Sequence, residues 1–364
     1  MSAAAGAPSG AAAGAAAGAP LAAPPAVDLA PFGLAIGHAA DAEGATGCTV
    51  VRGDRRAVRA AHALLGRASG SRELAAIAPE HLVGRADAVL LTGGSAYGLD
   101  AAAGVMRWME ERGRGFPVGD AAAGGVVPIV PAAVLFDLLP LGRFDRRPTP
   151  AMAYAACDAA GPLAAEQGSV GAGAGLTVGK ALGRAGAMKG GVGVADAWAG
   201  GDGVAAVAAV NAFGDVRDAA GRVLAGARGP GGRFAGESRP DAAPGAPGAP
   251  GEPPSATPAS PFANTTLAVV AASRPLDRVA LAQLARAAAA ALYRRITPCG
   301  TTFDGDVIFA LCPDDPPPPA DAPADRLRLE VLAVRALEEA VERAVRFAVG
   351  RDGVPGLADP PPPA

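Results

Sequence analysis

A stretch rich in proline and glycine, over residues 217–263, interrupts the chain. It contains the run DAAPGAPGAPGEPPSATPASP, which has too little large apolar surface to offset the entropy lost on ordering it. We therefore predict a disordered linker between two ordered regions, 28–216 and 264–351, that together form one globular domain. Similar composition predicts a disordered low-complexity tail over 1–27 and a disordered proline-rich tail over 352–364.

Apolar runs and helical periodicity alternate along both ordered regions, which predicts an α/β or α+β fold. The expected buried strands are 46–52, 87–92, 203–210, 265–272 and 306–312. The expected helices are 57–68, 96–113, 275–296 and 324–350. Two prolines within 126–138 predict that at least part of this segment is an edge strand or an extended loop.

Charge and composition argue against several classes of function. The net charge is −3 and the basic residues are interspersed with acidic ones, so we expect no nucleic-acid partner. There is no uninterrupted apolar span and no basic leader, so we expect a cytoplasmic protein without membrane contact. The four cysteines and three histidines lack ligand spacing, so we expect no metal, no cofactor and no disulfide framework.

The linker ends abruptly at Asn264 and Thr265, where a predicted buried strand begins. This arrangement would expose one peptide bond. Attack by the Thr265 hydroxyl on the Asn264 carbonyl, followed by hydrolysis of the ester, would release an N-terminal threonine whose amine can serve as its own general base. On this dipeptide alone, the simpler interpretation is that the two residues turn the chain into the strand.

Seven blocks of sequence, in this order, resemble the DmpA-type aminopeptidase family of self-cleaving N-terminal-nucleophile hydrolases, which includes the nylon-oligomer hydrolases. The blocks are GHAADAEGATGCTVVR, TGGSAYGLDAAAGV, VPIVPAAVLFDL, GSVGAGAGLTVGK, AVNAFGDV, NTTLAVVA and FDGDVIFAL. The resemblance covers nearly all of the ordered chain. It implies a four-layer αββα sandwich, one domain built from two autoprocessed subunits, and a homo-oligomer, which we expect to be a tetramer.

The resemblance also implies roles for individual residues. Thr265 matches the family nucleophile, and Asn264 matches the residue whose carbonyl is attacked. Thr266 is a second hydroxyl one residue further on, but side chains alternate along a strand, so it would point to the opposite face. Asp304 and Asp306 match an acidic pair of which one could orient the Thr265 hydroxyl and hold its ammonium. Without the resemblance, the DGD segment would be interpreted as a tight turn.

Four further residues are carried over by position. Asn211 matches an asparagine that resembles an oxyanion-hole donor, although an asparagine at a strand end is otherwise a turn former. Lys180 matches a lysine whose charge could lower the pKa of the threonine amine or stabilise developing negative charge. We expect Tyr97 and Phe136 to line the substrate pocket, and each could equally pack in the core. Phe136 stands where some members carry a tyrosine, so any hydrogen bond from that hydroxyl is absent.

These features predict an autoprocessing N-terminal-threonine amidohydrolase, an aminopeptidase acting on short peptides, peptide amides or esters. Two alternatives stay within the enzyme class: hydrolysis of ω-amino-acid (nylon-type) oligomers, and transfer of the aminoacyl group to an amine. A third alternative is a non-catalytic binding protein on the same scaffold that never cleaves itself.

Overall fold

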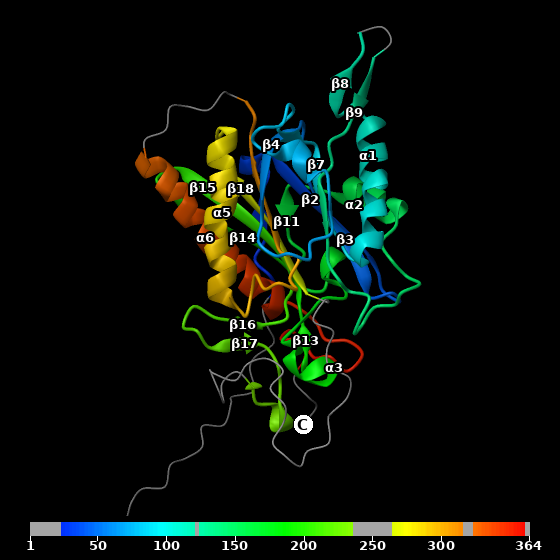
Figure 1. Cartoon of the computed structure of the whole chain (residues 1–364), viewed down its shortest axis with the longest axis vertical. Helices are drawn as coiled ribbons and strands as arrows, with labels where there is room; N and C mark the ends of the chain where they lie inside the picture. Colours follow the sequence, from blue (N-terminus) through cyan, green and yellow to red (C-terminus); the bar gives the residue numbers. More distant parts are fainter. Residues whose placement is uncertain (1–22, 121–123, 236–263, 316–322, 361–364) are drawn as a thin grey trace, which may run out of the picture.

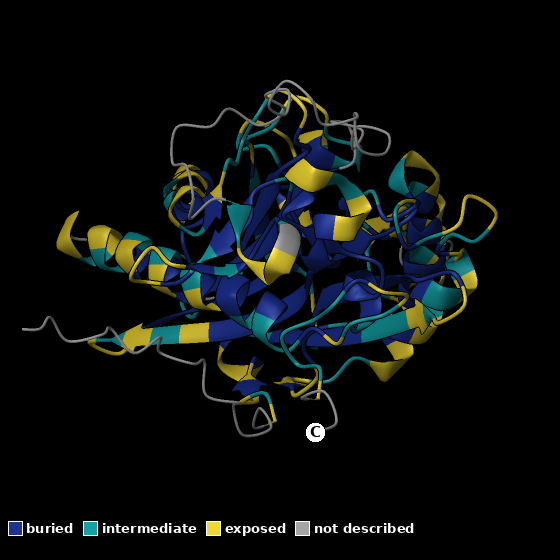
Figure 2. Cartoon of the chain, turned by 90° about the horizontal axis from the view of Figure 1, so that it is seen from below, coloured by how far each residue is buried: buried dark blue, intermediate teal, exposed yellow. Residues whose placement is uncertain are grey.

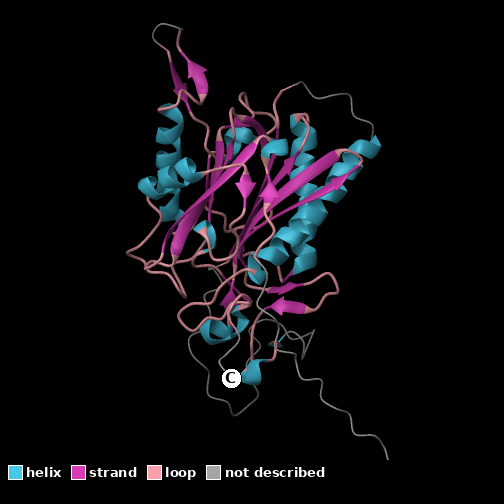
Figure 3. Ribbon diagram, turned by 180° about the vertical axis from the view of Figure 1, so that it is seen from behind, coloured by secondary structure: helices cyan, strands magenta, loops and turns pink. Residues whose placement is uncertain are grey.

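Two β-sheets stacked face to face, with helices on both outer faces, make up the body of the molecule (Figures 1 and 3). The computed structural model describes residues 23–120, 124–235, 264–315 and 323–360. The layers run helix, sheet, sheet, helix. This confirms the αββα sandwich predicted from the sequence.

The first sheet has five strands in the order β2-β3-β7-β10-β5. Its strands are β2 (Leu34–Asp41), β3 (Thr46–Gly53), β5 (Ser71–Arg72), β7 (Ala88–Thr92) and β10 (Ala132–Val134). Two helices, α1 (Ala102–Glu110) and α2 (Pro150–Ala159), cover its outer face, and a 3-10 helix, η3 (Ser95–Ala101), leads into α1. The outer core contains apolar side chains of β3, β7, α1 and α2.

The second sheet has six strands in the order β14-β15-β18-β20-β4-β6. Its strands are β4 (Val58–Leu64), β6 (Arg85–Ala86), β14 (Gly191–Ala199), β15 (Asp202–Asn211), β18 (Thr265–Ala272) and β20 (Val307–Cys312). The helices α5 (Arg278–Arg295) and α6 (Pro323–Arg346) pack on its outer face. Because β18 and β20 are parallel neighbours, both begin at the same end of the sheet.

Shorter elements complete the described residues. Small sheets are formed by β1 (Val27–Asp28) with β11 (Leu163–Ala164), β12 (Thr177–Val178) with β13 (Met188–Lys189), and β16 (Asp215–Arg217) with β17 (Val223–Ala225) and β19 (Ile296–Thr297). The hairpin of β8 (Phe116–Val118) and β9 (Gly125–Val127) projects beyond the sandwich (Figure 1). Single turns are η1 (Ala30–Phe32), η2 (Leu74–Ile77), η4 (Gly171–Gly173), η5 (Lys180–Leu182), α3 (Gly183–Gly186) and η6 (Pro230–Gly232).

Side chains alternate along β18 between the two cores of the sandwich. Leu267 and Val269 face the core between the sheets, whereas Ala268 and Val270 face α5 and α6. By this alternation, Thr265 belongs to the inner face and Thr266 to the helix face. Figure 2 shows the strands as the most buried part of the chain. The first hydroxyl of the strand is thus the one directed between the two sheets.

The expected strands at 46–52, 87–92, 203–210, 265–272 and 306–312 and the helices at 96–113, 275–296 and 324–350 are all confirmed as elements, with shifted ends. The helix expected over 57–68 is wrong, because this segment forms β4, which pairs with β20 and β6. Its alanines satisfied a helical pattern, but the pairing buries Val58, Ala60 and Ala61 within the sheet. Tertiary pairing therefore outweighs alanine's helix propensity here.

Ordered structure extends further than the sequence indicated at three predicted boundaries. The chain is already in place at Val27, which pairs with Ala164 in β1 and β11. Residues 217–235, assigned to the disordered linker, contain β17 and η6. Residues 352–360, assigned to the tail, include the buried side chain of Val354 and a carbonyl of Pro355 that accepts the Lys189 N–H. The remaining parts of the predicted tails and linker lie outside the described residues.

The segment 126–138 contributes to two elements. Its first residues belong to β9 and its later ones form β10, which lies between β7 and β5 and is not at the edge of the sheet. Within the part of the chain that the structure covers, none of the helices has the length and apolar character needed to cross a bilayer.

Candidate active site

The candidate site lies at the end of the second sheet where β18 and β20 begin. Thr265 is the first residue of β18 and stands opposite Asn211, the last residue of β15, in their antiparallel pairing. On the other side, Asn264 forms a parallel bridge with Asp304, just ahead of β20. Pairing among three neighbouring strands thus gathers residues that are far apart in sequence.

The carbonyl oxygen of Asn264 accepts two hydrogen bonds. The Thr265 hydroxyl donates to it over 2.5 Å, and the backbone N–H of Gly305 donates over 3.3 Å. A nucleophile precursor and a backbone donor therefore meet at one carbonyl, and a backbone N–H at a carbonyl is the arrangement that stabilises an oxyanion. Gly305 is not among the residues expected from the sequence, because the N–H that it donates is a group that every residue except proline has.

Glycine is required at position 305 by close approach. A Cβ there would lie 2.8 Å from the Thr265 hydroxyl oxygen and 2.9 Å from the carbonyl oxygen of Ala68. Both residues flanking the candidate scissile bond are buried, with Asn264 3% and Thr265 5% exposed. The expectation that the linker exposes this bond is therefore wrong, because the bond is already part of the sheet ladder.

The two carboxylates of the DGD segment hold backbone N–H groups. Asp306 accepts from the N–H of Thr266 at 2.6 Å and of Gly300 at 3.2 Å, and Asp304 accepts from the N–H of Thr301 at 2.7 Å. Burial raises the pKa of Asp306 to about 6, and the neighbouring charge of Asp304 adds to the effect. These contacts anchor the start of β18 to the start of β20.

Lys180 and Asn211 form a buried pair next to Thr265. The Lys180 ammonium donates to the side-chain oxygen of Asn211 at 2.9 Å and to its backbone carbonyl at 3.1 Å. Burial lowers the pKa of Lys180 to about 7, while the charge of Asp304 acts in the opposite direction. A lysine with this pKa can change protonation near neutrality, which suits it to proton transfer or charge stabilisation.

The amide of Asn211 is held at both ends. Its oxygen also accepts the N–H of Thr177 at 3.1 Å, and its nitrogen donates to the carbonyl of Phe136 at 2.9 Å. Two donors on one atom and an acceptor on the other assign the orientation of the amide. Phe136, predicted to line the pocket, therefore reaches the site through its backbone, and its side chain is half-buried.

Tyr97 lies apart from these hydrogen bonds. It belongs to η3, its side chain is 60% exposed, and its ring lies under the guanidinium of Arg147 at 4.1 Å. The structure thus brings together Thr265, Asn264, Asn211, Lys180, Asp304 and Asp306, with the carbonyl of Phe136 at their margin.

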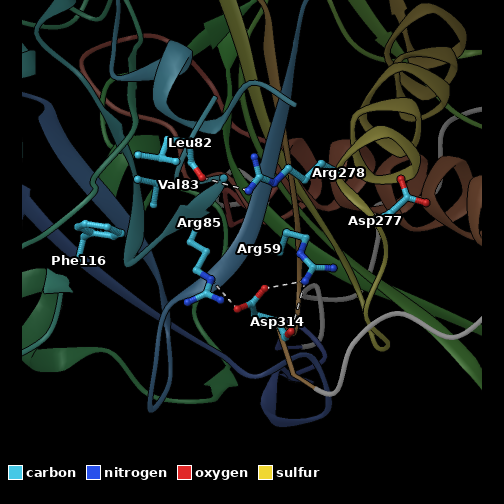
Figure 4. A pocket seen from close by; sticks show the side chains of 9 residues that line it. Arg59, Leu82, Val83, Arg85, Phe116, Asp277, Arg278 and Asp314 are labelled. Carbon is cyan, nitrogen blue, oxygen red and sulfur yellow. Dashed lines mark hydrogen bonds and ion pairs between the residues drawn. The ribbon is translucent and has the colours of Figure 1, made fainter. Parts of the chain in front are cut away.

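A cavity of about 550 Å³ lies away from this cluster (Figure 4). Its lining includes Asp314, which follows β20, whereas Asp304 and Asp306 precede that strand. Arg59 and Arg85 both pair with Asp314, at 2.8 and 2.6 Å. The cavity is thus at the other end of β20 and contributes no group to the cluster.

Comparison with known proteins places the chain in a family. Residues 30–356 match the model of peptidase family S58. A protein described as an uncharacterized aminopeptidase in Mycobacterium tuberculosis is 43% identical over 262 residues, covering 71% of this chain and 72% of its own length. A 6-aminohexanoate-oligomer endohydrolase of Agromyces sp. is 30% identical over 309 residues, covering 83% of this chain and 79% of its own.

Two solved structures share the fold. The L-aminopeptidase D-Ala-esterase/amidase of Ochrobactrum anthropi, described as a variant of the Ntn hydrolase fold, matches with a TM-score of 0.65 at 20% identity, over 90% of this chain and 87% of its own. A β-aminopeptidase of Burkholderia sp. matches with a TM-score of 0.63 at 21% identity, over 89% and 88%. The resemblance inferred from the sequence is confirmed: this chain belongs to peptidase family S58 and is a hydrolase of peptide bonds.

Proposed function

We propose that this protein is made as a precursor that cleaves itself between Asn264 and Thr265 and then uses Thr265 as an N-terminal nucleophile in an aminopeptidase. The observation that carries the proposal is the pair of hydrogen bonds on the Asn264 carbonyl oxygen, from the Thr265 hydroxyl at 2.5 Å and the Gly305 N–H at 3.3 Å. The nucleophile, the carbonyl that it attacks and the proposed oxyanion donor are therefore adjacent in the uncleaved chain.

In the proposed cleavage, the hydroxyl oxygen of Thr265 attacks the carbonyl carbon of Asn264, and the hydroxyl proton passes to the departing nitrogen. The C–N bond breaks and an ester forms. Water then hydrolyses the ester, leaving a carboxylate on Asn264 and a free amine on Thr265. Burial of the bond favours the first step, since a neighbouring side chain reaches the carbonyl, and water has to enter only to hydrolyse the ester.

In the mature enzyme, the amine of Thr265 takes the proton from its own hydroxyl, and the oxygen attacks the substrate carbonyl to give an acyl-enzyme that water hydrolyses. Asn211 offers its amide dipole to the oxyanion. Lys180 stabilises the negative charge that develops beside it. Asp304 and Asp306 hold the two strand ends and supply negative charge near the new ammonium.

Short peptides, peptide amides or esters with a free amino terminus are the proposed substrates. The relatives named as aminopeptidases support this assignment. The relatives named as 6-aminohexanoate-oligomer endohydrolases favour a second candidate, hydrolysis of ω-amino-acid oligomers. An α-peptide amide, a β-peptide and a 6-aminohexanoate oligomer, assayed side by side with and without an acceptor amine, separate these activities and distinguish hydrolysis from acyl transfer.

Variants at the strand start test the proposal. We expect Thr265→Ala to remain one chain on a denaturing gel and to lack turnover, because no hydroxyl faces Asn264. Thr265→Ser should still cleave, and Thr266→Ala should cleave and turn over, since Thr266 is on the helix face. A wild-type chain that stays intact after long incubation would favour a binding protein on this scaffold. Cleavage by Thr265→Ala would exclude the proposed nucleophile.

A further inference from the structure

Lysine is rare in this chain. Among the 32 lysine and arginine residues, only Lys180 and Lys189 are lysines. Both are buried, with Lys180 4% and Lys189 1% exposed. Lysine is a compact cation with three donors, whereas arginine is a wide planar fork, so the two are not interchangeable in a small buried space. Lys180 is one of the residues that form the candidate active site, whereas Lys189 is not.

The ammonium of Lys189 is enclosed by backbone carbonyls. It donates to the carbonyl oxygens of Gly173 at 3.2 Å, Ala174 at 3.0 Å and Leu176 at 3.0 Å. The three N–H donors of the ammonium have three carbonyl acceptors, so its hydrogen-bonding capacity is filled without direct contact with a carboxylate. These contacts fix the path of the glycine-rich segment that leads from η4 into β12.

One of these peptide groups links Lys189 to the active site. The carbonyl of Leu176 and the N–H of Thr177 belong to the same peptide group, and that N–H donates to the side-chain oxygen of Asn211 at 3.1 Å. A cation on the carbonyl side polarises the peptide and makes its N–H a stronger donor. Lys189 therefore acts on the Asn211 amide through a single peptide group.

The nitrogen end of the Asn211 amide is bound by a second segment, which lies near the same lysine. The Asn211 nitrogen donates to the carbonyl of Phe136 at 2.9 Å, and the next residue is the buried Asp137. Asp137 accepts from the Thr46 hydroxyl and the Gly94 N–H, both at 2.7 Å. Burial raises the pKa of Asp137 to about 6, against which the Thr46 and Gly94 hydrogen bonds and the charge of Lys189 act. Gly175 lies within the run of carbonyls that Lys189 binds, and a Cβ there would lie 3.0 Å from the Asp137 Cβ, so the segments that hold the two ends of the amide pack against each other.

We propose that Lys189 is a positioning residue for Asn211, with Asp137 as its counter-charge, and that the pair holds the Asn211 amide in the orientation required for stabilising the oxyanion. This inference rests on the proposed function and assigns a role to the second buried lysine. Lys189 itself touches no reacting atom.

The first test is the turnover of Lys189→Met, counted per free Thr265 amino terminus so that incomplete maturation does not lower the value. Methionine keeps the length of the side chain and removes the charge and its donors. We expect kcat to fall about 10- to 100-fold with little change in KM, because a misplaced donor weakens transition-state binding more than substrate binding. An unchanged kcat with fewer matured molecules would show that Lys189 only supports folding.

A double-mutant cycle gives the second readout. In an Asn211→Ala background, we expect Lys189→Met to lower kcat less than about 3-fold further, because the group it positions is gone. Full multiplication of the two losses would overturn the proposal. So would loss of maturation in Lys189→Met that Asn211→Ala does not share, since the lysine would then serve a step independent of the asparagine.

Asp137→Asn keeps the proposal testable if Lys189→Met does not fold. Asparagine retains an acceptor for the Gly94 N–H and removes the charge opposite Lys189. We expect a several-fold loss in kcat that also disappears in the Asn211→Ala background, whereas a loss that persists there contradicts the proposal. Thr265→Ala in parallel separates the two claims, because turnover by that variant would refute the nucleophile whatever happens at Lys189.

Discussion

Gly305 is the residue whose backbone most directly serves the proposed cleavage, and it can be tested alone. We expect Gly305→Ala to slow precursor cleavage by about 100-fold or more, because its methyl group would displace the Thr265 hydroxyl or the N–H that binds the Asn264 carbonyl. The measurement is the rate of fragment appearance on a gel. Gly161→Ala is the control, since a Cβ there meets nothing within 4 Å. Equal rates for the two variants would rule out this role for Gly305.

At this scale, the sequence could identify side chains but not backbone donors. Thr265, Asn211, Lys180, Asp304 and Asp306 were found through the resemblance, and strand pairing brings them together. The contribution of Gly305 is an N–H that every residue except proline has, so no residue type could indicate it. Lys189 was visible only as one of two lysines, and its importance depends on carbonyls whose direction no sequence pattern reveals.

Among the elements, the short turn η5 positions Lys180, and the two glycines on its borders differ in what surrounds them. Gly179 and Gly183 both have positive φ, 65° and 70°, but a Cβ on Gly179 would lie 2.1 Å from a backbone atom of Gly226, whereas one on Gly183 meets nothing. Substitution by alanine costs backbone strain at both positions, about 1 kcal/mol at Gly179, whose ψ of 50° is left-handed helical, and up to about 3 kcal/mol at Gly183, whose ψ of −166° is reached almost only by glycine.

We therefore expect both variants to lose stability, but only Gly179→Ala to lose turnover as well, because its clash with Gly226 must move the turn that carries Lys180. Thermal unfolding and kcat measured on the same preparations provide the comparison. Similar turnover of the two variants would mean that the position of η5 does not control the site.

The helices and strands also show which parts of the fold could be predicted from the sequence and which could not. The strands β18 and β20 and the helices α5 and α6 were predicted, because long apolar or amphipathic runs dominate their local preferences. The β4 segment was not, since an alanine-rich run fits either structure until its partners are known. Its register with β20 is a contact between residues about 250 positions apart, which local periodicity cannot encode.

For the whole molecule, four buried titratable side chains predict how the free energy of unfolding depends on pH. Burial raises the pKa of Asp137 and Asp306 to about 6 and lowers the pKa of Lys180 and Lys189 to about 7. The carboxylates bind more protons when folded, so their contribution to the free energy of unfolding falls as pH rises towards 6. The lysines bind fewer protons when folded, so their contribution rises with pH above 7.

We expect the free energy of unfolding to rise between pH 7 and pH 8, because at higher pH the cysteine thiols, whose pKa values burial raises, ionise in the unfolded chain and act in the opposite sense. Denaturant unfolding of the Thr265→Ala precursor, which stays one chain, is the measurement. Adding Lys189→Met should reduce the slope by up to about 1.4 kcal/mol per pH unit, the value for one proton. A slope unaffected by that substitution would show that Lys189 does not change its protonation on unfolding in this range.

Mass spectrometry of the purified wild-type protein shows whether and where the chain is cleaved, because the mass of each fragment identifies the bond that was broken. We expect two fragments, one ending with Asn264 and one beginning with Thr265, and a single intact mass for Thr265→Ala. A wild-type chain that remains whole, or a fragment that begins at Thr266 or at any other residue, would contradict it.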